Sequence, residues 1–152
     1  MVKSFRKIVI ALLTSFILLL SCAHVNAESV ISVPLYQEVY ILENNSYYVD
    51  TIYQPSFARS GINGQKTRSY YDSGKLAWTL TVNGSFSYNG TSSSCTGSSV
   101  TYTINDGAWS KTSTSSTSSG NTATAYGSFR KNNGQTGSTS VSLSCDRNGN
   151  LS

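Results

Sequence analysis

An all-β fold, specifically an antiparallel β-sandwich of the immunoglobulin-like or a similar type, is predicted by three features of this sequence. Apolar residues alternate with small polar ones in several short stretches, which is the two-residue period of a half-buried strand. Clusters of Asn, Asp and Gly end these stretches, as turns require. Charged residues make up only 12% of the chain, whereas Ser, Thr, Gly and Tyr are abundant, which is typical of small extracellular β proteins.

The first 27 residues are predicted to be a secretory signal peptide. Three basic residues precede an apolar run from Ile8 to Leu20, and Val25 and Ala27 stand at the spacing that a signal peptidase reads. The run is too short and wrongly flanked for a membrane-spanning helix. We therefore expect cleavage after Ala27 and a secreted product whose fold begins at residue 28.

Lipidation is the alternative to simple secretion. The letters LLSC, which end at Cys22, resemble a lipobox, in which the cysteine becomes the lipidated N-terminus of a surface lipoprotein. Leu20 is less usual than a small residue at its place in that motif. Cleavage after Ala27 is the favoured interpretation, and attachment to a membrane is expected only with a lipid on Cys22.

Removal of the leader changes the charge and the available chemistry. The whole sequence has a formal charge of +4, but only eight Lys and Arg remain against seven Asp and Glu after residue 27. This near-neutral balance argues against nucleic-acid binding. His24, the only histidine, leaves with the leader, so neither a Ser-His-Asp nor a Cys-His arrangement is available. We expect no enzyme and no cofactor; a hydrolase that uses a Ser-Lys pair or carboxylates is the least favoured alternative.

Two cysteines, Cys95 and Cys145, remain after the leader and are expected to form one disulfide. An isolated pair in an oxidising compartment most often pairs with itself. Closing a loop of this length stabilises a folded chain by about 4 kcal/mol in the chain-entropy model.

The remaining chain divides into an acidic, tyrosine-rich segment, residues 28–58, and a β domain, residues 59–152. The segment carries four acids and no base, with Pro34 and Pro55 as breaks. It could supply one or two edge strands, lie as an extended arm on the body, or be a removable leader. Residues 58–68 are expected to be an exposed linker.

The clearest strand runs over residues 76–88, where the large apolar side chains all fall on even positions. A hairpin at Asn83-Gly84 would place the apolar residues of its two arms on opposite faces. One long strand, bent at Gly84, is predicted instead, with the turn at Asn89-Gly90. Shorter strands are predicted over residues 67–71, 100–104, 123–129 and 141–145, and the Ser/Thr-rich residues 113–120 are predicted to be a polar loop.

One order of residues, Ala-Trp, Gly-Ser-Phe, Asn-Gly and Cys, occurs twice with different gaps. The Gly-Ser-Phe parts are residues 84–86 and 127–129. Two hairpin units that pack face to face would explain the order, and coincidence in a chain of few residue types is the alternative.

The last residues have the spacing of a calcium loop, because Asp146, Asn148 and Asn150 lie two apart. A calcium loop also needs Gly at its sixth position and Glu at its twelfth, and neither is present. Asp, Asn and Gly are ordinary turn residues. We therefore predict a strand end with a capping turn and no metal site.

Aromatic side chains are the main candidates for binding. Seven of the ten tyrosines fall between Tyr36 and Tyr71, and two pairs are adjacent. In a strand, one ring of each adjacent pair must face away from the core, where it suits glycan stacking or protein contacts. The candidate residues are Tyr47, Tyr48, Tyr70, Tyr71 and Trp109, the last because it directly follows a turn.

The stretches AWTLTVNGSFSYNGTSSSC, NTATAYGSF and LSCDRNGNLS together resemble a group of small secreted proteins of Gram-positive bacteria. The resemblance covers about residues 66–152. It implies secretion and a β fold, and it implies no activity, because none is associated with that group. A fainter resemblance is to the β-sandwich bacteriocins of the lactococcin 972 type, which are shorter and lack this cysteine pair.

These observations predict a secreted, non-catalytic module that binds an extracellular partner, which is a glycan, a protein or a cell envelope. The alternative is a secreted antimicrobial effector that acts on the envelope of a competitor cell.

Overall fold

A computed structural model describes residues 7–8, 34–53, 57–58 and 61–152 of the chain. Within these residues the fold is all β, with ten strands and no helix. The strands are β1 (Lys7–Ile8), β2 (Pro34–Ile41), β3 (Tyr47–Tyr53), β4 (Phe57–Ala58), β5 (Gly61–Asp72), β6 (Lys75–Tyr88), β7 (Ser93–Ile104), β8 (Trp109–Ser119), β9 (Thr122–Lys131) and β10 (Thr136–Ser144). The predicted signal peptidase site at Ala27 and the lipobox cysteine, Cys22, lie outside the described residues.

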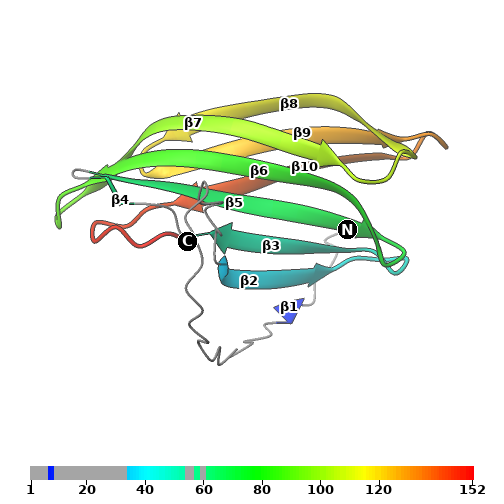
Figure 1. The fold of residues 1–152 in the computed structure, drawn as a ribbon, viewed down its shortest axis with the longest axis horizontal. Helices are drawn as coiled ribbons and strands as arrows, with labels where there is room; N and C mark the ends of the chain where they lie inside the picture. The colour runs from blue at the N-terminus through cyan, green and yellow to red at the C-terminus, as the bar shows by residue number, and fades with distance from the viewer. Residues whose placement is uncertain (1–6, 9–33, 54–56, 59–60) are drawn as a thin grey trace, which may run out of the picture.

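The strands form two antiparallel sheets (Figure 1). The larger has the order β1-β2-β3-β5-β6-β7, with β4 paired to β5, and the smaller has the order β10-β9-β8. The predicted all-β, two-sheet architecture is therefore confirmed. The immunoglobulin-like order is wrong: that fold exchanges strands between its sheets, whereas here each sheet is built from strands that follow one another in the chain.

The two sheets do not cover each other fully. The small sheet packs on the half of the large sheet formed by β5, β6 and β7, through β10 against β5 and β6 and β9 against β6 and β7. Strands β2 and β3 continue the large sheet past the edge of β10 (Figure 1). We call β5 to β10 the sandwich half and β2 with β3 the wing.

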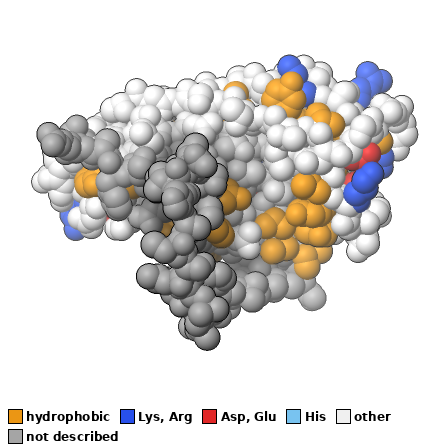
Figure 2. Space-filling model, in the orientation of Figure 1, with side chains coloured by type: hydrophobic (Ala, Val, Ile, Leu, Met, Phe, Trp, Pro, Cys, Tyr) orange, Lys and Arg blue, Asp and Glu red, His pale blue; other side chains and the backbone are white. Residues whose placement is uncertain are grey.

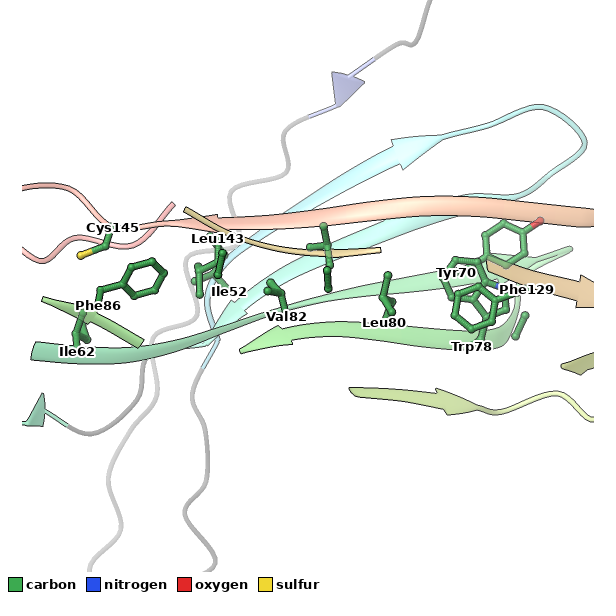
Figure 3. Close-up of a cluster of buried hydrophobic side chains, with 14 of the residues drawn as sticks. Ile52, Ile62, Tyr70, Trp78, Leu80, Val82, Phe86, Phe129, Leu143 and Cys145 are labelled. Carbon is green, nitrogen blue, oxygen red and sulfur yellow. The ribbon is translucent and has the colours of Figure 1, made fainter. Parts of the chain in front are cut away.

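The hydrophobic core fills the space between the sheets in the sandwich half and includes Ile52 of β3 (Figure 3). Its centre is a stacked pair, Trp78 of β6 and Phe129 of β9, with ring centroids 4.0 Å apart and an interplanar angle of 12°. The largest fully buried side chains are Trp78, Phe129, Leu80, Leu143, Val82, Val141 and Cys145. The alternation that predicts strands therefore also identifies most of this core.

Both Gly-Ser-Phe sequences place a phenylalanine ring over the glycine two residues earlier. A Cβ on Gly84 would lie 2.6 Å from ring atoms of Phe86, and one on Gly127 would lie 2.9 Å from the ring of Phe129. The glycines thus leave room for rings that fold back along their own strands. The predicted pair of equivalent hairpins is wrong, because the first Ala-Trp and Gly-Ser-Phe share strand β6, whereas the second are divided between the start of β8 and β9.

The single long strand at residues 76–88 is confirmed as β6, and the predicted turn follows it. The Asn89 side-chain oxygen accepts hydrogen bonds from the backbone N–H of Thr91 and Ser92. Gly90 has a φ of 82°, a conformation that glycine adopts at no steric cost.

The polar loop predicted at residues 113–120 is wrong, because residues 109–119 form strand β8. This strand is the last of the small sheet, and its inward positions beyond Trp109 meet the edge of β7 rather than the core. Ser116 Oγ, for example, donates a hydrogen bond to Ser98 O over 3.4 Å. A strand in this place needs no apolar alternation, and so the sequence pattern misses it.

The tyrosine-rich segment and its linker also join the sheet. Residues 34–41 and 47–53 form β2 and β3, so the described part of the segment supplies two strands, of which β3 is internal, between β2 and β5. The linker expected at residues 58–68 is wrong from residue 61 onward, where β5 begins and pairs with both β3 and β6. The segment is therefore continuous with the sheet of the β domain.

The chain end is a capping turn. Asp146 Oδ1 accepts hydrogen bonds from the backbone N–H of Asn148 and Asn150, each over 2.8 Å, and Oδ2 accepts one from the Asn150 side chain. Gly149 has a φ of 86°. These contacts use both carboxylate oxygens, confirming the predicted turn. They also lower the pKa of Asp146, chiefly through the Asn150 side chain and then through backbone N–H groups.

Cys95 and Cys145 are free thiols in this structure, and the predicted disulfide is not formed. The two cysteines nevertheless flank the same turn. The N–H of Cys95 donates to Gly120 O over 2.8 Å, and the N–H of Cys145 donates to Asn121 O over 3.0 Å. Burial raises the pKa of the Cys145 thiol, with a smaller contribution from Asp146.

Candidate binding surface

The adjacent tyrosines divide between the two faces of the large sheet. Directly opposed residues of antiparallel strands share a face. Tyr48 is opposite Tyr70, which is opposite Trp78, so this row faces the small sheet. Tyr47 is opposite Tyr71, and this row faces away from it. The prediction that one ring of each pair points away from the core is therefore confirmed.

The inner row belongs to the aromatic part of the core. Tyr70 stacks on Trp78 with centroids 5.0 Å apart and meets Trp109 edge-on at 5.4 Å, while Tyr48 contacts both Tyr70 and Trp78. Tyr70 and Trp109 are only 6% and 4% exposed. These two predicted binding residues therefore lie in the core and offer almost no accessible ring area to a partner. Trp109 follows a turn, but the turn directs it inward, where Lys131 of β9 lies over its ring.

The outer row forms an apolar surface on the wing. Tyr47 and Tyr71 stack with centroids 4.5 Å apart and planes within 7° of parallel. Ile41, which is 47% exposed, is opposite Tyr47, and Leu76 is opposite Tyr71. Val39 and Val49 form the next row on the same face. We call these six residues the tyrosine ridge: Val39, Ile41, Tyr47, Val49, Tyr71 and Leu76.

The ridge differs from the rest of its face. Figure 2 shows hydrophobic side chains gathered over β2, β3 and the neighbouring end of β5. The row next to Val39 and Val49 on the same face is a line of threonines across four strands: Thr51, Thr67, Thr81 and Thr101. Thr51 is buried (4% exposed), and the ridge residues other than Ile41 are half-buried. Apolar side chains gathered on one face in this way are typical of an interaction site.

The inner face of the wing holds a buried charged pair between two core residues of β3, Tyr48 and Ile52. Arg68 of β5 makes a two-fold ion pair with Asp50 of β3, in which Nε donates to Oδ1 and Nη2 to Oδ2, each over 2.6 Å. The Asp50 side chain is only 3% exposed. Arg68 Nη1 reaches across to the small sheet and donates to Thr139 Oγ1 and Ser140 O. One side chain therefore connects the wing to the edge of β10.

Aromatic rings surround this ion pair. The Arg68 guanidinium lies 5.1 Å from the centre of the Tyr48 ring and 5.6 Å from that of Tyr40. Burial opposes the charged form of Arg68, but the hydrogen bonds and charge of Asp50 outweigh it and raise the pKa of Arg68. Burial also raises the pKa of Tyr48, and burial together with a hydrogen bond to Glu38 raises that of Tyr40. Arg68 therefore stays charged at neutral pH, and the two tyrosines stay neutral.

Sequence reasoning did not identify the ion pair. Asp50 and Arg68 are 18 residues apart, and their contact depends on the register of β3 against β5. The sequence shows only that an acid and a base lie at inward positions of two strands. The register of β3 against β5 must be known before the two can be paired.

No group of three His, Cys, Asp or Glu side chains in the described part of the chain could hold a metal ion. A hollow of about 150 Å³ lies at the β6–β7 turn, lined by Ser87, Tyr88, Asn89 and Ser92 to Ser94. That volume is below the roughly 300–1,000 Å³ of most small-molecule sites. Within the described ranges, no helix is long and apolar enough to cross a membrane.

Comparison with protein-family models, with curated proteins and with solved structures finds no match to this chain. The tyrosine ridge and the Arg68–Asp50 pair are therefore interpreted on their geometry alone.

Proposed function

We propose that this chain is a secreted, non-catalytic module that binds an extracellular protein through the tyrosine ridge. The observation that carries the proposal is the stacked Tyr47–Tyr71 pair. Two large aromatic side chains lie on a face that the small sheet does not cover, next to an exposed Ile41. Aromatic residues, tyrosine among them, are enriched at the centres of protein interfaces.

The orientation of the rings favours a protein over a glycan. Adjacent strands lie about 4.8 Å apart. The two rings come from adjacent strands and stack at 4.5 Å, so their planes stand upright on the sheet. Their faces are turned toward each other and toward Ile41 and Leu76. A sugar lying on this surface would meet ring edges and hydroxyls, whereas a protein side chain could insert beside the rings.

Secretion and disulfide formation are part of the same proposal. The predicted leader would bring the chain to an oxidising compartment, where Cys95 and Cys145 could pair across the turn that both flank. A disulfide there would stabilise the sandwich half as the support of the binding surface. The resemblance to small secreted proteins of Gram-positive bacteria agrees with an extracellular role.

The test measures binding of the fluorescently labelled exported protein to intact cells of the producing species. The test variant is Tyr47→Ser/Tyr71→Ser, which removes the stack. The matched control is Tyr126→Ser, because Tyr126 is a 46% exposed tyrosine on the outer face of the other sheet. We expect the double variant to lose at least ten-fold in affinity and the control to match the wild type.

Two treatments of the cells separate a protein partner from a glycan. Mild surface proteolysis should abolish binding, and periodate oxidation of surface sugars should leave it unchanged. Binding that survives proteolysis but not periodate would reject the protein partner. Equal loss in the double variant and the Tyr126 control would reject the ridge as the binding surface.

A further inference from the structure

All the described residues that line the hollow between β6 and β7 are uncharged. They are Ser87, Tyr88, Asn89, Ser92, Ser93 and Ser94. The volume of the hollow, about 150 Å³, is that of a cavity that accommodates one benzene molecule, which is a six-membered ring. A polar hollow of this size therefore has room for one small ring-shaped molecule that carries hydrogen-bonding groups.

The C-terminal turn holds the hollow in a fixed shape. This turn and the β6–β7 turn lie at the same end of the molecule (Figure 1), and the N–H of Gly90 donates to Arg147 O over 2.9 Å. The ring of Tyr88 lies against Gly149, where an added Cβ would come within 2.6 Å of it. A site that already has its shape loses less conformational entropy when a ligand binds.

Asn89 brings hydrogen-bond donors to the hollow. Its side-chain oxygen accepts hydrogen bonds from the N–H of Thr91 and of Ser92, over 3.0 and 2.9 Å, and these bonds fix the side chain in place. The side-chain nitrogen has no hydrogen-bond partner among the described residues. An amide nitrogen carries two donors, and a ligand in the hollow would be able to accept from them.

The serines add a further donor and several acceptors. The hydroxyls of Ser87 and Ser94 lie 2.9 Å apart and share one hydrogen bond, so this pair keeps one O–H donor and further lone pairs. Ser93 Oγ donates its proton to Cys145 O over 2.6 Å, and it is therefore left to accept. The hollow thus offers donors and acceptors together, without a charge.

We propose that this hollow is a binding site for one neutral sugar residue. The hydroxyl groups of a sugar ring both donate and accept, as the Asn89 amide and the serine hydroxyls require. A charged ligand would find no opposite charge among the lining residues, and a purely apolar ring would leave their polar groups without partners. A free monosaccharide and the end residue of a glycan share this chemistry.

The sugar site is separate from the tyrosine ridge. Strand β6 runs from Lys75, next to Leu76 of the ridge, to Tyr88 at the hollow, so the two surfaces lie at opposite ends of one strand. A single sugar residue has few atoms, and we expect a dissociation constant of about 1 mM. Binding this weak does not hold dilute protein on cells, and so the periodate treatment described above still tests the ridge alone. Each site can therefore fail without the other.

The test is a titration of the isotope-labelled exported protein with glucose, galactose, mannose and N-acetylglucosamine, followed by amide chemical shifts. Glycerol, a polyol without a ring, is the control ligand. The test variant is Asn89→Asp, which keeps the oxygen that caps the turn and replaces the donating nitrogen by an acceptor. The matched control is Asn133→Asp, because Asn133 Oδ1 caps the β9–β10 turn in the same way and accepts from the N–H of Gln135 over 3.0 Å.

We expect at least one of the sugars to shift the signals of residues 87–94 in a saturable way, and glycerol to leave them unchanged. Asn89→Asp should lose about ten-fold in affinity while Thr91 and Ser92 keep the signals of the folded turn, and Asn133→Asp should bind like the wild type. The methyl glycoside of the same sugar separates the two sources, because only a site for the end of a glycan binds it as well as the free sugar.

Three results would overturn the proposal. The first is the absence of a saturable shift with all of these sugars. The second is a set of shifts that maps outside residues 87–94. The third is an affinity of Asn89→Asp equal to that of the wild type, because the amide donors would then have no part in binding.

Discussion

The sandwich half and the wing arrange polarity in opposite ways. In the sandwich half the inner face holds Trp78, Leu80 and Phe129, and the outer faces are mostly serine and threonine. In the wing an ion pair lies on the inner face, and tyrosines with aliphatic residues lie on the outer face. The wing thus buries a charged pair beside Ile52, whereas the inner face of the sandwich half is apolar.

The difference follows from what covers each face. The small sheet removes water from the inner face of the sandwich half, so apolar residues there gain the free energy of burial. It ends at β10, and beyond that edge Arg68 satisfies both Asp50 and the backbone of β10. The apolar outer face of the wing is turned away from the small sheet and gathers half-buried tyrosines beside the exposed Ile41, which is why we interpret it as a binding surface.

Arg68→Met should cause the largest loss of stability, because it leaves Asp50 buried without its partner. Breaking a buried ion pair from one side costs about 3–5 kcal/mol. Urea unfolding followed by tryptophan fluorescence measures this loss. The control is Arg68→Met/Asp50→Leu, which makes the inner face of the wing apolar like that of the sandwich half and should recover most of the loss. A double variant as unstable as the single one would show that Arg68 acts mainly through β10.

A disulfide between Cys95 and Cys145 should stabilise the sandwich half, which contains both cysteines, and so increase the difference in stability between it and the wing. The expected gain in the free energy of unfolding is about 4 kcal/mol in the chain-entropy model. Intact mass with and without reductant detects the loss of two hydrogens, and paired unfolding curves give the gain. Cys145→Ser should show neither effect. An exported protein with two free thiols would refute the pairing.

Gly127→Ala should destabilise the sandwich half by about 1–3 kcal/mol through overpacking. The added Cβ would lie 2.9 Å from the Phe129 ring and 3.0 Å from Leu80. Gly137→Ala on the neighbouring strand is the matched control, since a Cβ there meets nothing within 4 Å. Thermal unfolding should separate the two variants, and equal melting temperatures would mean that the core relaxes freely around the new methyl group.

Tyr71→Ser should reduce stability by only about 1 kcal/mol, although it removes half of the stacked pair. The wing's outer face would then resemble the polar outer face of the sandwich half. Chemical denaturation of this variant, compared with Tyr126→Ser, tests whether the ridge serves the fold or a partner. A loss above about 3 kcal/mol, as for a buried aromatic, would assign the tyrosine to the fold.

The smallest expected effect concerns the capping turn and depends on pH. The pKa of Asp146 is lower in the folded chain than in the unfolded one, so its contribution is present above the unfolded value, near 3.9, and disappears as pH falls through the folded value. The stability difference between wild type and Asp146→Ala should therefore shrink between neutral pH and about pH 2. If the stability difference between the two proteins stays constant with pH, the loss in Asp146→Ala comes from the backbone of the turn and not from the charge of the carboxylate.

The sequence predicted those elements whose pattern depends on the core. Strand β6 and the turn after it follow from alternating apolar residues and from Asn89-Gly90. Strand β8 does not, because its inward serines and threonines meet another strand edge rather than apolar side chains. The turn signal before Trp109 similarly gives no information on the direction in which the next side chain points.

The sequence predicts that the candidate site is built from tyrosines, but it does not predict which tyrosines belong to it. Adjacency in a strand shows that Tyr47 and Tyr48 face opposite ways, but only the register with β5 shows which one stacks on Tyr71 and which one joins the core. Long-range register also decides the Arg68–Asp50 pair. A single sequence contains no direct signal of such pairings.

Arg68 has a consequence for motion. Its guanidinium makes four hydrogen bonds, two to Asp50 on β3 and two to β10, so that neither strand can open at this point without breaking contacts to the other. Local opening of the wing and of the β10 edge is therefore one cooperative event rather than two independent ones. The surface proposed to bind a partner is thus mechanically linked to the core sheet, and a partner that holds the wing still would also slow the fluctuations of β10.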